Sequence, residues 1–162
     1  MISFDIDDYR YNLRAAALIL NDDSILLHQI EGDDFWFVPG GRVDAGELAA
    51  TTIVREMQEE LAESVVCEKL LWTVENFFTY RGQRHHEIGL YFLTHLQPGS
   101  RLLTTPGPYA GMEGKLKLHF DWFKRADLHQ LDVRPSFLIH ALAGLQRNEP
   151  LTAQHIVQRE SE

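Results

Sequence analysis

The sequence has one cysteine and no long hydrophobic run, and both shortages narrow the class of protein. Cys67, the single cysteine among 162 residues, cannot form an internal disulfide, which favours a reducing compartment. The N-terminal residues show no basic segment followed by an apolar stretch, so no signal peptide is visible. Their longest apolar run, residues 15–20, is far shorter than the ~20 residues that span a bilayer. We therefore expect a cytoplasmic protein without a membrane partner.

Basic residues are scarce relative to acidic ones: 15 Lys and Arg stand against 24 Asp and Glu, a formal net charge of −9. This balance argues against a nucleic-acid partner, because such binding needs a basic face. It does not exclude a polyanionic substrate, since a metal ion can supply the positive charge. The hydrophobic share of 44% and the charged share of 24% are typical of a globular protein. We expect a single domain over residues 1–162.

The hydrophobic patterns predict strands, a helix, more strands and a second helix. Strands are expected at residues 11–20, 25–30, 35–38, 65–79, 86–96, 116–123 and 151–157. Helices are expected at residues 47–62 and 135–147, with a short helical turn at 125–130. Glycine-rich and proline-rich loops are expected at residues 40–46 and 97–114. This order predicts an α+β fold, a mixed sheet flanked by helices.

The helix predicted at residues 47–62 has two distinct faces. Its apolar stripe follows an i, i+4, i+7, i+11 pattern that should face the core, with Ala50, Val54, Met57 and Leu61. Glu56, Glu59 and Glu60 lie on another side, where like charges repel each other by a few tenths of a kcal/mol per pair. Such a face is either a solvated acidic surface or a site for a hard cation such as Mg²⁺. The helix alone leaves both interpretations open.

The residues around this helix decide between them. Gly41 is followed after five residues by Glu47 and, after seven more, by the run REMQEE at 55–60. This spacing resembles the Nudix box, in which every charged position and the first glycine are matched here. Two positions depart from it: Ala62 replaces the second glycine and Glu63 the aliphatic residue after it. Because glycine usually forms the left-handed cap, Ala62 predicts a different closure or a slightly longer helix.

The resemblance is looser outside the box but spans most of the chain. The lead-in FWFVPGG at residues 35–41, the segment His86-Glu87-Ile88 and Trp122 are similar to segments of Nudix proteins. The resemblance implies the Nudix α/β/α sandwich, in which the box forms a loop–helix–loop motif. It also leaves a homodimer as an expectation.

By resemblance, the protein is a divalent-metal-dependent pyrophosphohydrolase. Such enzymes cleave a nucleoside diphosphate linked to another moiety, X, by water attack on phosphorus, and release a nucleoside monophosphate and phosphate-X. The implied cofactor is Mg²⁺, with Mn²⁺ as an alternative, because it offsets the charge of the pyrophosphate. The implied ligands are Glu56, Glu59, Glu60 and the carbonyl of Gly40, where the missing side chain allows close approach.

The resemblance also implies roles for the remaining charged residues. Arg55 would orient carboxylates by pairing with Glu59 and Glu47, and Glu47 would fix the loop. The general base is either Glu59 or Glu87, and the sequence leaves this choice open.

Substrate contacts are predicted from aromatic and basic residues near these motifs. Trp36 and Phe37 can stack on a base, although aromatic strand residues are more often part of the core. Arg14 and Arg81 can hold a phosphate, and Arg14 needs a partner because it lies in an apolar strand.

The substrate itself stays open. By resemblance it can be a (deoxy)nucleoside triphosphate, including an oxidised one, an ADP-ribose-like nucleotide sugar or a dinucleoside polyphosphate. A Nudix-fold binding or regulatory module without catalysis is the alternative class. Such a module would be expected to lose box glutamates, whereas all of them are present here.

Overall fold

The computed structural model describes residues 1–145 and 153–160. The first half contains β1 (Ser3–Ile6), β2 (Tyr9–Asn21), β3 (Ser24–Ile30), β4 (Gly40–Arg42), α1 (Ala49–Leu61) and β5 (Val65–Tyr80). The second half contains β6 (Gln83–Leu96), α2 (Arg101–Thr104), β7 (Tyr109–Glu113), β8 (Leu116–Lys124), η1 (Arg125–Gln130), α3 (Phe137–Ala143) and β9 (Gln154–Arg159).

The strands of the described residues form one mixed sheet. Its order is β7-β8-β3-β2-β6-β5-β9, and β1 and β4 both pair with β2. The β2–β6 and β5–β9 pairs are parallel, and the other pairs are antiparallel. The predicted mixed sheet and its hairpins are therefore confirmed.

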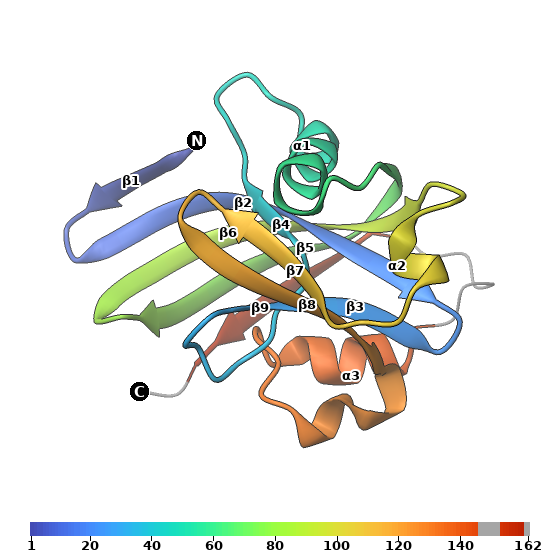
Figure 1. Cartoon of the computed structure of the whole chain (residues 1–162). Helices are drawn as coiled ribbons and strands as arrows, with labels where there is room; N and C mark the ends of the chain where they lie inside the picture. Colours follow the sequence, from blue (N-terminus) through green and yellow to red (C-terminus); the bar gives the residue numbers. More distant parts are fainter. Residues whose placement is uncertain (146–152, 161–162) are drawn as a thin grey trace.

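Helices cover both faces of this sheet (Figure 1). Alternation along β2 divides its side chains between two cores. Ala15, Ala17 and Ile19 pack with Ile53 and Met57 of α1. The intervening residues of β2, which are Ala16, Leu18 and Leu20, pack on the opposite face. Their partners there are Leu138 and Leu142 of α3. This arrangement confirms the predicted α/β/α sandwich.

The structure corrects the predicted helix at residues 47–62. The helix α1 begins at Ala49, and its buried stripe contains Ile53, Met57 and Leu61. Val54, which the wheel placed in the core, is 40% exposed. The stripe is therefore rotated toward Ile53, and this rotation turns Glu60 into the interior as well.

The C-terminus of α1 has the cap that a glycine usually supplies. Ala62 itself adopts the left-handed conformation with φ 56°, its N–H donates to the Gln58 carbonyl and the Glu63 N–H donates to the Met57 carbonyl. The bond from Ala62 to the carbonyl four residues earlier is the closure of the αL motif, which glycine usually supplies. The expectation of a different closure or a longer helix was therefore wrong.

Three predicted segments also differ in the structure. Residues 35–38 form no strand, because only isolated bridges join Trp36 to Val133 and Phe37 to His28. The start of the predicted 40–46 loop is the strand β4. A Cβ on Gly40 would lie 2.1 Å from the Ala15 carbonyl oxygen, so glycine lets β4 approach β2. The predicted 97–114 loop contains α2 and β7.

The C-terminal predictions are met in part. The helix α3 ends at Ala143, and the predicted end at residue 147 lies outside the described residues. The predicted last strand corresponds to β9, although its first two residues, 151–152, also lie outside them.

Candidate active site

The glycine that opens the box lets α1 lie close to the sheet. A Cβ added to Gly41 would lie 2.1 Å from Oε1 of Glu56, far inside van der Waals contact. The Glu56 carboxylate therefore occupies the space that any other residue at position 41 would fill. This close approach joins β4 to α1 at the position of the box glutamates.

Arg55 connects the carboxylates around it. Its Nε and Nη2 donate to the two oxygens of Glu47 at 3.0 Å each, and its Nη1 donates to Glu56 at 2.8 Å and Glu59 at 3.3 Å. The hydrogen bonds from Arg55 and then Thr52 lower the pKa of Glu47 to about 2. One guanidinium thus holds the loop glutamate and two helix glutamates in fixed relative positions.

Glu60 is the most unusual member of the group. The residue is only 5% exposed, and Oε2 has no hydrogen-bond partner among the described residues. Burial, the negative charge of Glu56 and then that of Glu113 raise the pKa of Glu60 to about 8. Burial also raises the pKa of Glu56. Two neighbouring carboxylates, Glu60 buried and Glu56 half-buried, resist ionisation and are stabilised by a cation, so the donor set fits a hard metal ion.

The other implied ligands lie less favourably. Glu59 is 60% exposed and is held by Arg55, while the Gly40 carbonyl accepts a hydrogen bond from Arg14 at 3.2 Å. Within residues 1–145 and 153–160, no group of three or more His, Cys, Asp or Glu side chains is already arranged to hold a metal ion. The structure therefore brings Glu56 and Glu60 together and leaves Glu59 at the rim.

A cavity of about 490 Å³ lies beside this helix. Gly41, which contacts Glu56, and His28, which lies 4.0 Å from Glu60, both belong to its lining. Among the described residues that line it, the arginines are Arg10, Arg14, Arg42, Arg81 and Arg134, and the phenylalanines and tyrosines are Phe35, Phe37, Phe78, Tyr80 and Tyr91. The cavity thus offers positive charge and flat apolar surface next to the box glutamates.

Arg14 connects the cavity to the box. Its guanidinium donates to the carbonyls of Val38 and Gly40 and lies over the Phe37 ring. It favours the charged forms of Glu56, Glu60 and Glu87. The partners that the sequence predicted for this partly buried charge are therefore backbone carbonyls and nearby carboxylates.

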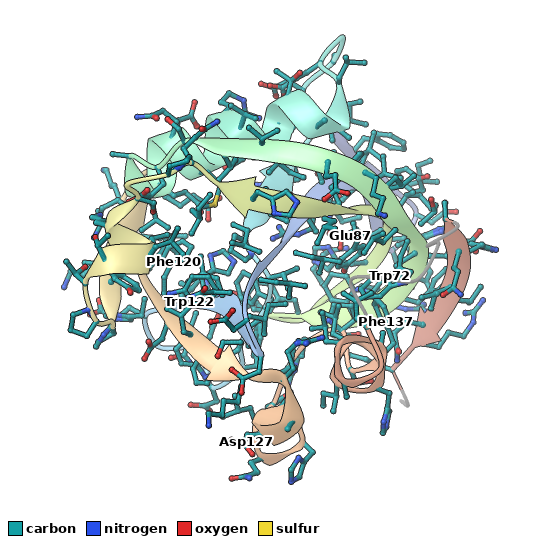
Figure 2. All side chains as sticks on the ribbon, turned by 90° about the vertical axis from the view of Figure 1, so that its right-hand side faces the viewer. Trp72, Glu87, Phe120, Trp122, Asp127 and Phe137 are labelled. Atoms are coloured by element: carbon teal, nitrogen blue, oxygen red, sulfur yellow. The ribbon has the colours of Figure 1, made fainter. Side chains whose placement is uncertain are left out.

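Glu87 lies inside the cavity rather than against α1. It is 8% exposed, and burial raises its pKa while Arg14 and Arg42 oppose the rise. In Figure 2 it lies on the same side of the molecule as Trp72, away from Phe120 and Trp122. It is also not among the charges that shift the pKa of Glu60.

The remaining predicted contact residues divide between the cavity and the core. Phe37 and Arg81 line the cavity, and Arg81 also forms a 3.3 Å ion pair with Asp33. Trp36 instead packs edge-on against Phe123, with 4.7 Å between ring centroids, and belongs to the core on the α3 side. Trp36 therefore does not line the cavity, because successive residues of this extended segment point to opposite sides, and its contact with substrate stays a prediction.

Two site residues escaped the sequence reasoning. His28 is buried with both ring nitrogens unpartnered among the described residues, and burial holds its pKa well below the usual range. Glu113 lines the cavity and acts on Glu60, yet it lies in a segment predicted to be a structureless loop. A lone histidine in an apolar strand was the one visible signal for His28, and no signal marked Glu113.

A helix that carries carboxylates, an arginine that holds them and an adjoining basic, aromatic cavity together suit the hydrolysis of a phosphoric anhydride. The chain belongs to the NUDIX family: the family model for the NUDIX domain matches residues 10–141. It is therefore a Nudix hydrolase, an enzyme that acts on pyrophosphate bonds. No curated protein sequence matches the chain significantly.

Solved structures share the fold at low identity. An ADP-ribose pyrophosphatase from Streptococcus suis 89-1591 superposes with a TM-score of 0.62 at 17% identity, over 91% of this chain and 98% of that one. A MutT NUDIX hydrolase from Burkholderia pseudomallei gives 0.60 at 23% identity, over 84% and 98%. A UDP-X diphosphatase gives 0.57 at 18% identity, over 90% and 66%. Within the described residues, no helix has the length and apolar character to cross a membrane.

Proposed function

We propose that this chain is an Mg²⁺-dependent hydrolase, with Mn²⁺ as an alternative metal, that cleaves a nucleoside diphosphate linked to a moiety X. Water attacks phosphorus, and a nucleoside monophosphate and phosphate-X leave. The observation that carries the proposal is the unpartnered, buried carboxylate oxygen of Glu60, next to Glu56 and beside a cavity rich in arginine. Such a carboxylate is stabilised when a cation binds.

We assign the residues of the box two roles, which are to bind the metal ion and to orient its ligands. Glu56 and Glu60 hold the ion, with Glu59 and the Gly40 carbonyl as further ligands. When bound, Mg²⁺ offsets the phosphate charge and lowers the pKa of its water. Arg55 and Glu47 keep the carboxylates in place through the contacts described above.

The general base is proposed to be Glu59. It lies on the same helix as the two ligand glutamates and is exposed, so that solvent water reaches it. Glu87, the other candidate, lies on the cavity side, where the charges of Arg14 and Arg42 act on its carboxylate. Glu87→Gln and Glu59→Gln separate the two, because loss of the base lowers kcat much more than it changes KM.

The substrate is proposed to lie in the cavity with its phosphates toward Arg14 and its base on the aromatic side. Arg14 lies between the cavity and the box, and Phe37 lies beneath it. Arg81, which also lines the cavity, is proposed to contact X. Nucleoside triphosphates, nucleotide sugars and dinucleoside polyphosphates all contain the required linkage.

Further expectations accompany this proposal. The retained box glutamates and Arg55 favour an enzyme over a binding module, because a module needs no metal ligands. A single domain of residues 1–162, a cytoplasmic location and a homodimer stay predictions.

A panel of nucleoside diphosphate derivatives tests the proposal. We expect hydrolysis with Mg²⁺, none in excess EDTA, and incorporation of labelled oxygen from water into one product. Glu60→Gln should lower kcat by orders of magnitude, whereas the control Glu75→Gln, on the face of β5 away from the cavity, should match the wild type. Full activity in EDTA, or a fully active Glu60→Gln, would overturn the proposal.

A further inference from the structure

We propose that His28 is a ligand of the metal ion that Glu60 binds, and that its ring nitrogen makes the site select a transition-metal ion such as Mn²⁺ over Mg²⁺. The inference rests on the proposed function, since it assumes a metal ion at the box glutamates. It goes further by adding a ligand from outside the box and by naming the class of metal that this ligand favours.

Two unpartnered atoms lie opposite each other beside the box. Nδ1 of His28 and Oε2 of Glu60 are 4.0 Å apart, and both side chains are 2% exposed. Neither atom has a hydrogen-bond partner among the described residues. The separation is too long for a hydrogen bond, so a buried nitrogen and a buried oxygen both stay unsatisfied. Two such atoms that face each other indicate a group that bonds to both of them.

Strand pairing holds the His28 ring in this position. His28 of β3 pairs with Phe120 of β8 (Figure 2) and forms a bridge with Phe37. Its ring packs edge-on against Phe37, with 4.1 Å between centroids, and tilted against Phe120, with 5.0 Å between centroids. Aromatic rings on two sides restrict rotation of the imidazole. His28 is therefore preorganised toward Glu60.

The gap between His28 and Glu60 suits one metal ion. Bonds from a metal to imidazole nitrogen and to carboxylate oxygen are about 2.1 Å each, so two of them span up to about 4.2 Å. A neutral imidazole has one nitrogen lone pair to donate. The two side chains alone do not complete a site, but His28 also lines the cavity, so water and phosphate oxygens can supply the other ligands.

The charge around Glu60 favours a cation in this gap. One cationic group, Arg14, acts on both Glu60 and His28. Three carboxylates act on Glu60 in the opposite sense, and they belong to Glu56, Glu113 and Glu59. Acidic groups thus outnumber the basic one, and a bound cation reduces the repulsion among them.

The nitrogen ligand determines which metal the site favours. Mg²⁺ prefers oxygen ligands, whereas imidazole nitrogen is a common ligand of transition-metal ions. A nitrogen ligand therefore raises the affinity for Mn²⁺ relative to Mg²⁺. Because many sites bind transition-metal ions more tightly than Mg²⁺, the informative quantity is the part of this preference that depends on His28.

Pulsed electron paramagnetic resonance of bound Mn²⁺ tests direct ligation. Mn²⁺ in the wild-type protein should show coupling to a directly bonded nitrogen nucleus, and His28→Leu should abolish it. His86→Leu is the matched control and should keep the coupling. Nε2 of His86 is also buried without a partner in the described part of the chain, but its ring packs against Tyr11 and Phe77, outside the cavity lining.

Titration calorimetry with Mn²⁺ and with Mg²⁺ measures the selection. His28→Leu should weaken Mn²⁺ binding by about 100-fold, the upper end of the effect of losing a residue that supports a metal site. It should weaken Mg²⁺ binding only a few-fold, and His86→Leu should change neither affinity. The metal-free His28→Leu protein should melt no lower than the wild type, because the change removes unpaired buried nitrogens. An equal fall in affinity for both ions would overturn the inference.

Hydrolysis assays separate the inference from the proposed function. Mn²⁺ binding that requires Glu60 but shows no nitrogen coupling would overturn the inference, with water as the bridging group, and leave the proposed function intact. Nitrogen coupling from His28 without hydrolysis of any nucleoside diphosphate derivative would support the inference and refute the proposed function. Failure of the folded protein to bind either ion would overturn both.

Discussion

Glu63 and Ser100 are joined by a buried 2.6 Å hydrogen bond from the serine hydroxyl to the Glu63 carboxylate. Arg101 adds a 3.3 Å ion pair to the same carboxylate and donates to the Leu61 carbonyl at the end of α1. Glu63 stands where the Nudix box has an aliphatic residue. The departure therefore ties α2 to the end of the catalytic helix and anchors the segment that leads to Glu113.

Glu63→Val, which restores the aliphatic residue of the box, should destabilise the protein. It leaves the Ser100 hydroxyl and Arg101 without their acceptor, at a cost of about 1–3 kcal/mol, which urea unfolding measures. The control Glu31→Val removes an exposed ion pair with Lys117 and should change the free energy of unfolding by much less. A Glu63→Val variant as stable as the wild type would show that the link has no energetic role.

Ala62→Gly should stabilise the protein by about 0.5–1 kcal/mol. Ala62 has φ 56°, a conformation that glycine adopts without the steric cost of a Cβ. The melting temperature should rise by a few degrees. The matched change Ala50→Gly, inside the same helix, should lower stability by about 1 kcal/mol, since only the loss of helix propensity acts there. If both changes destabilise equally, the left-handed residue is not strained.

Gly41→Ala should lower kcat on the order of 100-fold, because the new Cβ would displace the Glu56 carboxylate. Gly82→Ala is the control: its Cβ meets no atom within 4 Å, although its positive φ adds backbone strain. It should lower stability slightly and leave kcat unchanged. Steady-state kinetics measures both variants. An equal loss of kcat in the two would argue against a specific role for Gly41.

The metal-free protein should lose stability as pH rises from about 4.5 to about 8. The pKa of Glu60 rises from its ordinary 4.5 to about 8 on folding, so the folded state binds the extra proton across this window. The stabilisation is complete below the lower value and lost above the upper one, at most about 5 kcal/mol.

Unfolding in EDTA at several pH values measures this slope. Glu60→Gln should flatten it and leave the protein more stable than the wild type at pH 8, because the buried charge is gone. Mg²⁺ should raise the melting temperature of the wild type more than that of Glu60→Gln. A pH profile that is the same in both proteins would remove Glu60 as its source.

The box could be recognised from the sequence because its residues lie close together along the chain. Glu56, Glu59 and Glu60 share one helix, and Arg55 reaches Glu47 over a span fixed by the helix and one loop. The apolar, core-facing stripe of the same helix was predicted less well. Val54 and Ile53 are both apolar, and only packing against Ala15 and Ala17 selects Ile53 as the buried one.

Contacts between distant segments could not be predicted. Glu113 follows a loop rich in glycine and proline, and its influence on Glu60 depends on the pairing of β7 with β8. Trp36 and Phe37 are adjacent aromatic residues, and no sequence pattern assigns one to the core and the other to the cavity.

The sequence by itself determined the family, the mixed α+β architecture and the carboxylate helix, because periodicity and motif spacing act over a few turns or strands. Tertiary structure alone decided that Glu60 is buried beside His28, that Arg14 lies between the box and the cavity, and that Asn76 lies next to Glu87. Strand register and sheet twist place these residues together, and both depend on the packing of the whole chain.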